Sequence, residues 1–136
     1  MKALPIAATA AIFVALSLQA QAEIMNSGDG FVTTSGNIQC NQSDPAQSEN
    51  PIRVFCIRSK PSALMAYIEN GHVKVTDKLI FSIDIEEQPT LHDGDSNVYA
   101  NTTCTSAKDG VTCTDKGTSF KISRRGVETL KQGPAP

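Results

Sequence analysis

Residues 102–113, TTCTSAKDGVTC, contain two of the four cysteines of the chain with a turn signal between them. If residues 107–110 form a four-residue loop, Cys104 lies directly opposite Cys113. Asp109-Gly110 is a typical hairpin pair because Gly adopts a positive φ at little cost. Cross-strand neighbours are close enough at Cβ for a disulfide. The stretch therefore predicts a β-hairpin closed by a disulfide.

The four cysteines, Cys40, Cys56, Cys104 and Cys113, allow three pairings, and the sequence alone does not choose among them. The hairpin geometry favours Cys104 with Cys113, which leaves Cys40 with Cys56. Metal binding is the alternative, but structural zinc sites usually place cysteines two to four residues apart, and the gaps here are 15 and 8 residues. A redox site would need Cys-x-x-Cys, which is missing. We expect two structural disulfides, no metal and no cofactor.

The first 22 residues have the organisation of a secretory signal peptide. Lys2 precedes the apolar run 3–18, and Ala20-Gln21-Ala22 offers a small-x-small cleavage site. A membrane anchor is the alternative, but this run is too short to span a bilayer well. We expect cleavage after Ala22, no membrane span afterwards, and a single domain over residues 23–136 that is secreted or periplasmic.

Turn signals recur about every ten residues and separate short runs rich in Val, Ile, Thr and Phe. This pattern is typical of an all-β protein, and it predicts a small antiparallel sandwich or barrel held together by two disulfides. The expected strands lie at residues 37–40, 52–58, 72–75, 79–85, 98–104, 111–114 and 119–123. Residues 59–71 suit either a helix capped by Ser59 or a hairpin turning at Asn70-Gly71, and the hairpin is favoured.

Composition disfavours several classes of partner. The chain has 12 Lys and Arg against 14 Asp and Glu, a net charge of −2, and its basic residues are scattered. Nucleic-acid binding depends on clustered cations, so no nucleic-acid partner is expected. The absence of Trp and the few aromatics weaken the case for a sugar platform.

Few residues indicate chemistry. Residues 93–97, DGDSN, resemble the start of a calcium loop, but Val98 stands where that loop needs Gly, and a polar connection is the favoured interpretation. His72 and His92 lie beside turns and are expected to be exposed. The carboxylates of residues 84–87 end a predicted strand, where solvation explains them. No catalytic residue is assigned.

Arg124-Arg125 is the only adjacent basic pair in the exported part of the chain. Two guanidinium groups could grip an anionic partner through bidentate contacts, and these residues are the candidate binding residues. The alternative is a turn with two exposed arginines. Arg124, which closes a predicted strand, could be either a structural clamp or a binding contact.

Three phrases together, FVTTSGNIQC (31–40), VFCI (54–57) and TCTSAKDGVTCTDKGTSFKISRRGVE (103–128), resemble a family of small secreted bacterial proteins known only as a domain of unknown function. Thr34 stands where that family favours Pro, and Asp115 where it favours Asn. The resemblance covers about 45 positions and does not extend to the middle of the chain. It implies a bacterial exported domain with the cysteine pairing favoured above, and it implies no activity.

These observations predict a non-catalytic binding module of the periplasm or cell exterior, with an unidentified protein or envelope partner. Two alternatives remain. One is a small secreted hydrolase that uses a carboxylate or histidine of residues 84–95, such as Glu87 or His92. The other is an envelope structural protein without a specific ligand.

Overall fold

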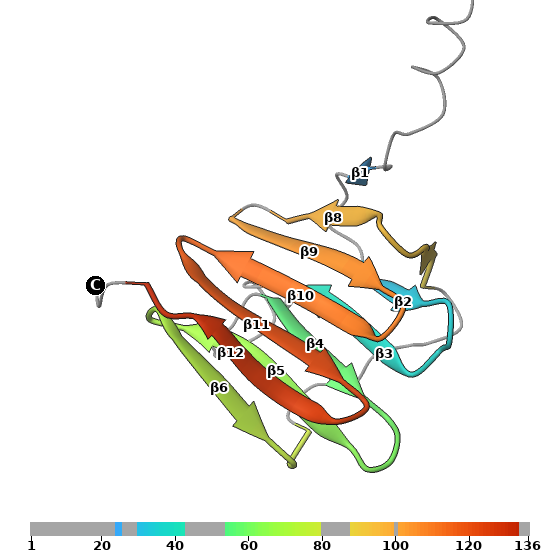
Figure 1. Ribbon diagram of the computed structural model, residues 1–136, viewed down its shortest axis with the longest axis horizontal. Helices are drawn as coiled ribbons and strands as arrows, with labels where there is room; N and C mark the ends of the chain where they lie inside the picture. Colours follow the sequence, from blue (N-terminus) through green and yellow to red (C-terminus); the bar gives the residue numbers. More distant parts are fainter. Residues whose placement is uncertain (1–23, 26–29, 43–53, 80–87, 100, 134–136) are drawn as a thin grey trace, which may run out of the picture.

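The computed structural model describes residues 24–25, 30–42, 54–79, 88–99 and 101–133. These residues form two six-stranded sheets that lie face to face as a sandwich, with no helix among them (Figure 1). The first sheet has, in spatial order, β1 (Ile24–Met25), β8 (Ser96–Val98), β9 (Thr102–Ala107), β10 (Gly110–Asp115), β11 (Thr118–Ser123) and β12 (Gly126–Lys131). The second has β6 (His72–Thr76), β5 (Leu64–Glu69), β4 (Val54–Arg58), β3 (Ile38–Gln42), β2 (Phe31–Thr33) and β7 (Thr90–Leu91).

The all-β prediction is confirmed, and the architecture is the sandwich rather than the barrel because each sheet has two free ends in its strand order. The expectation of purely antiparallel pairing is wrong in two places. β1 pairs with β8, and β2 pairs with β7, and both pairs are parallel. Both parallel pairs are only two residues long and involve an end strand of a sheet. The extended central ladders of both sheets are antiparallel.

The β9–β10 hairpin has the predicted register, with Cys104 opposite Cys113. Its turn is shorter than expected, because Ala107 and Gly110 already pair as strand residues. Gly110 is also not among the described residues of positive φ, so the reason given for Gly there is wrong. A Cβ on Gly110 would collide with the carbonyl oxygen of Ile122 on β11. Close packing between strands therefore requires the glycine.

The region that suited either a helix or a hairpin forms the β5–β6 hairpin. Asn70 and Gly71 make the turn, with φ of 51° and 77°, as a tight two-residue hairpin turn requires. The strand expected over 98–104 is wrong, because the chain turns between β8 and β9 and the backbone N–H of Tyr99 donates to the carbonyl of Thr102 (2.8 Å). Most of the strand expected over 79–85 lies outside the described residues.

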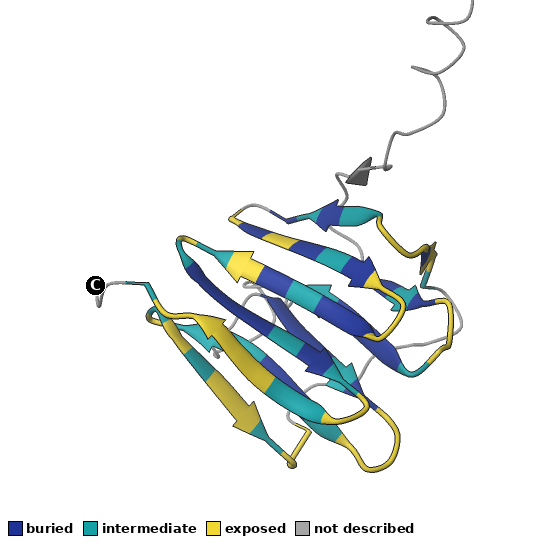
Figure 2. Ribbon diagram, in the orientation of Figure 1, coloured by how far each residue is buried: buried dark blue, intermediate teal, exposed yellow. Residues whose placement is uncertain are grey.

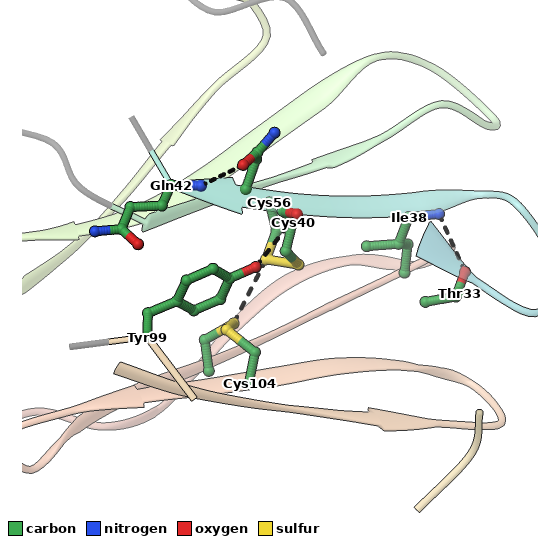
Figure 3. The surroundings of a disulfide bond; sticks show 9 residues. Thr33, Ile38, Cys40, Gln42, Cys56, Tyr99 and Cys104 are labelled. Carbon is green, nitrogen blue, oxygen red and sulfur yellow. Dashed lines mark hydrogen bonds between the residues drawn. A yellow bond between two sulfur atoms is a disulfide. The ribbon is translucent and has the colours of Figure 1, made fainter. Parts of the chain in front are cut away.

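The core lies between the sheets, and the disulfides are at its centre (Figures 2 and 3). Cys40 is bonded to Cys56 and Cys104 to Cys113, which confirms the favoured pairing. Each disulfide joins directly opposite residues of neighbouring strands, with Cα–Cα distances of 4.0 and 4.1 Å. Each therefore staples one sheet rather than linking the two. The largest fully buried side chains beside them include Phe31, Phe120, Leu91 and Ile122.

The other face of β4 and β5 also holds buried apolar side chains. Phe55 and Met65 form a second cluster with the partly buried Ile57 and Tyr67. β4 is therefore covered on both faces, which explains its nearly continuous apolar sequence VFCI. Within the described ranges, no helix is long and apolar enough to cross a membrane.

Candidate functional site

Three turns meet at one end of the sandwich, on the right in Figure 1, and line a cavity of about 370 Å³. They are the β2–β3 turn (33–38), the β9–β10 turn (107–110) and the β11–β12 turn (123–125). The first belongs to one sheet and the other two to the facing sheet, so the cavity spans both layers. Its volume lies within the range of small-molecule and side-chain binding sites. It is called the three-turn cavity below.

The described residues that line the three-turn cavity have an excess of positive charge. Lys108, Arg124 and Arg125 are exposed cations, and Asp109 is the one anion among those residues. Lys121 Nζ donates to Asp109 Oδ2 at 2.6 Å. That hydrogen bond, aided by the charges of Lys121 and Arg125, lowers the pKa of Asp109 below its ordinary value of 3.8. Because Asp109 is paired with Lys121, no ion pair within the described residues occupies Lys108, Arg124 or Arg125.

A buried arginine lies behind this charged surface. Arg58, at the end of β4, is only 5% exposed. Its Nη1 donates to the carbonyl oxygens of Ser123 (3.4 Å) and Arg124 (3.2 Å), both of which line the cavity. Its Nε and Nη2 donate to the carbonyl oxygen of Ser62 (3.1 and 3.0 Å).

Arg58 therefore connects the second sheet to the β11–β12 turn of the first. Every acceptor just named is a neutral carbonyl, and no carboxylate of the described residues pairs with this guanidinium. Within the described part of the chain, the charge of Arg58 is solvated by these carbonyls and by the Ser62 hydroxyl (3.2 Å), and no carboxylate there neutralises it. It both fixes the turn that carries Arg124 and Arg125 and adds to the positive potential at this end of the molecule.

Polar contacts also order the β2–β3 turn. The side-chain oxygen of Asn37 accepts a hydrogen bond from the backbone N–H of Lys60 (2.8 Å), and its amide donates to the Lys60 carbonyl (3.0 Å). Thr33 Oγ1 accepts from the N–H of Ile38 (3.3 Å) and lies 3.2 Å from Ser35 Oγ. The hydroxyl-bearing wall of the cavity is therefore held in place before any ligand arrives.

The structure places both candidate binding residues, Arg124 and Arg125, at the three-turn cavity. Arg124 could be either a structural clamp or a binding contact. Its side chain is exposed, and its backbone carbonyl accepts a hydrogen bond from Arg58. The clamp is therefore Arg58, which the sequence analysis did not single out. The sequence signal that could have identified Arg58 is its position at the end of the otherwise apolar run VFCIR. A charged side chain in such a run can be buried only when it is well hydrogen-bonded.

The other residues considered for chemistry lie elsewhere. His92 is exposed and its side chain makes no hydrogen bond to another described residue, while residues 84–87 lie outside the described ranges. His72 Nδ1 lies 2.5 Å from Gln132 Nε2 on an exposed surface. In the stretch resembling a calcium loop, the N–H of Gly94 donates to the Ser106 carbonyl (2.7 Å), and the Asp95 carbonyl accepts from the N–H of Ser106 (2.9 Å). These contacts bind that stretch to β9 as a connection.

A second cavity, of about 210 Å³, lies at the opposite end of the strands and carries the opposite charge. Glu69 and Asp115 are the charged residues among its described lining residues, and Thr102 Oγ1 donates to Asp115 Oδ2 (3.2 Å). By the charged residues among their described linings, the three-turn cavity is therefore basic and the second cavity acidic.

Comparisons of this chain with protein-family models, with curated proteins and with solved structures found no match. The resemblance to the family of small secreted proteins stays a prediction, and the three-turn cavity is interpreted from its own chemistry.

Proposed function

We propose that this protein is an exported, non-catalytic binding module that takes carboxylate groups of an acidic segment of a partner protein into the three-turn cavity. The observation that carries this proposal is the position of Arg124 and Arg125, on a turn held by the buried Arg58, beside Lys108. A guanidinium presents its N–H groups in a planar fork that matches a carboxylate, so a pair of them at a cavity suits a ligand with several carboxylates.

The excess of cations favours an anionic ligand over a neutral one, although the whole chain is slightly acidic, with a net charge of −2. Positive potential gathered at one end steers an acidic partner to that end. The acidic second cavity at the far end would repel the same partner, which favours a single orientation of binding.

The described lining residues support binding more than catalysis. They include no histidine and no cysteine, and their hydroxyls belong to Thr33, Thr34, Ser35 and Ser123. A hydroxyl needs an adjacent base to act as a nucleophile. The single lining carboxylate, Asp109, has a lowered pKa and is paired with Lys121, so it is a poor proton acceptor near neutral pH. A hydrolase built on His92 would lack any described hydrogen-bonded partner for its imidazole.

Two considerations support export. The first 22 residues carry the signal-peptide pattern described above. The two disulfides are typical of proteins that fold outside the reducing cytoplasm. Both observations support a secreted or periplasmic location for the domain over residues 23–136, where an envelope or external protein would be its partner.

Isothermal titration of the oxidised domain with a short poly-Glu peptide tests this proposal, with the poly-Gln peptide of equal length as the uncharged control. Binding of poly-Glu but not poly-Gln is expected. In the double variant Arg124→Gln/Arg125→Gln, affinity should fall about 5- to 30-fold, because two guanidinium–carboxylate contacts worth about 0.5–1 kcal/mol each are lost. Inorganic phosphate in a parallel titration distinguishes carboxylate recognition from general anion capture.

The matched control is Lys74→Gln/Lys131→Gln, which makes the same change of charge at exposed positions on β6 and β12 outside the cavity lining. This variant should retain affinity within about twofold, since exposed charges beyond a Debye length are largely screened at physiological salt. Equal losses in the two double variants would show that net charge rather than the cavity controls binding, and would overturn the proposal.

A further inference from the structure

The two disulfides form a compact group of four sulfur atoms at the centre of the sandwich. All four Sγ atoms lie within 4.8 Å of one another, and Cys56 Sγ lies 3.5 Å from Cys113 Sγ on the facing sheet. Figure 3 shows the contact between the two sulfur pairs, beside the hydroxyl end of Tyr99. The four cysteines are 0% exposed and come from four strands, β3, β4, β9 and β10.

This spacing matches the requirement of a tetrahedral metal site. Zinc holds cysteine sulfurs at about 2.3 Å, which places the sulfurs of a tetrahedral site about 3.8 Å apart. The two facing disulfides already bring sulfurs of different pairs to about that separation. We propose that the reduced form of this protein binds one zinc ion through Cys40, Cys56, Cys104 and Cys113. Among the described residues, these four are the one group of three or more potential ligand side chains gathered within reach of a single ion.

The disulfide form and the metal form exclude each other. Two molecules of a dithiol reductant supply four electrons and four protons, convert both disulfides into four thiols, and leave as two disulfides. Zinc then displaces up to four protons from the thiols as the zinc–sulfur bonds form. Oxidation of the thiols reverses the change and expels the ion. Zinc itself is redox-inactive, so it does not reoxidise the sulfurs that hold it.

The surroundings favour a soft cation. The sulfurs lie among apolar side chains such as Phe31, Phe120 and Ile122, with no described carboxylate or histidine to provide a harder ligand. Thiolate ligands select zinc over calcium or magnesium in such a setting. Because thiols must lose protons to bind, affinity should rise with pH. The fold can form this site although the sequence spacing does not resemble a zinc knuckle, since the ligands meet across two sheets.

The test uses the whole domain reduced with a phosphine, freed of reductant under inert gas and titrated with Co²⁺ and then Zn²⁺. The expected result is one Co²⁺ per chain with the visible absorption of tetrahedral sulfur coordination, its loss on addition of Zn²⁺, and a rise of at least several degrees in the Tm of the reduced protein with Zn²⁺. The oxidised protein should show none of these changes, and magnesium should not replace zinc.

Two double variants, Cys40→Ser/Cys56→Ser and Cys104→Ser/Cys113→Ser, each retain one disulfide when oxidised, so their folding can be verified by circular dichroism before reduction. Each should lose one-to-one zinc binding by at least about 100-fold, because losing two of four direct ligands costs more than the roughly 10–100-fold typical of losing a group that only hydrogen-bonds to a ligand. Binding retained by either variant would overturn a four-sulfur site. So would a reduced wild-type protein that binds no zinc, or one whose Tm zinc leaves unchanged.

Discussion

Replacement of Arg58 by methionine removes the contacts that join the second sheet to the β11–β12 turn while keeping a long side chain in the same space. Three carbonyl oxygens, those of Ser62, Ser123 and Arg124, lose a charged donor. A hydrogen bond to a charged group contributes about 1.5–3 kcal/mol, and water can reach the exposed Ser62 end of the network. Removing the desolvated charge offsets part of the loss. We therefore expect a net destabilisation of about 3 kcal/mol, or roughly 10–15 °C in Tm.

The assay is thermal and urea unfolding of the oxidised protein followed by circular dichroism. Arg58→Lys should be intermediate, because one ammonium retains the charge but cannot supply the planar fork. Arg124→Met is the matched control: its side chain is exposed, and it should change stability by no more than about 0.5 kcal/mol. An Arg58→Met protein as stable as wild type, or an equal loss in Arg124→Met, would refute the assignment of the clamp to Arg58.

Three further outcomes follow from the contacts of the β9–β10 hairpin and its surroundings. Replacing both Cys104 and Cys113 by serine opens a loop of 9 residues' separation and should cost about 2.6 kcal/mol by the chain-entropy relation, measured by urea unfolding; a loss below about 1 kcal/mol would contradict it. Gly110→Ala should destabilise the protein by about 1–3 kcal/mol, because the added methyl group overpacks against β11. Gly36→Ala should cost less, about 1 kcal/mol, because only its φ of 77° opposes the substitution. A larger loss of Tm in Gly36→Ala would be inconsistent with this packing. Because the pKa of Asp109 is lowered on folding, its ion pair stabilises the protein above pH about 3.8 and the contribution is lost as pH falls below that value. The stability difference between wild type and Asp109→Asn should therefore vanish at low pH, and a difference that grew on acidification would have the wrong sign.

Part of the strand and hairpin content could be predicted because its signals are local, but β1, β2, β7 and β12 were not among the expected strands. The directly opposite cysteine pair and Asn70-Gly71 each act over a few residues, and each placed its hairpin correctly. The role of Gly110 was misjudged because the constraint comes from Ile122 on a third strand, which no local pattern reveals. The turn after Val98 was also missed. Tyr99 continues the pattern of a strand, but the chain turns there.

The candidate site shows the same limit. Arg124-Arg125 is visible as an adjacent basic pair, and it lies at the three-turn cavity. The cavity itself depends on three turns from two sheets meeting at one end, and the buried Arg58 acquires its role only from carbonyls that lie 65 and 66 residues away in the chain. The sulfur cluster is a similar case, because its two halves meet only when the sheets pack.

The most direct test of the binding proposal is a two-dimensional ¹H–¹⁵N NMR titration of the oxidised domain with the poly-Glu peptide. We predict that the amides with the largest shifts belong to the three turns of the cavity, residues 33–38, 107–110 and 123–125, and that these shifts saturate at one peptide per chain. Poly-Gln should leave the spectrum unchanged. The largest shifts at the second cavity around Glu69 and Asp115, or no saturable shift at the three turns, would contradict the account.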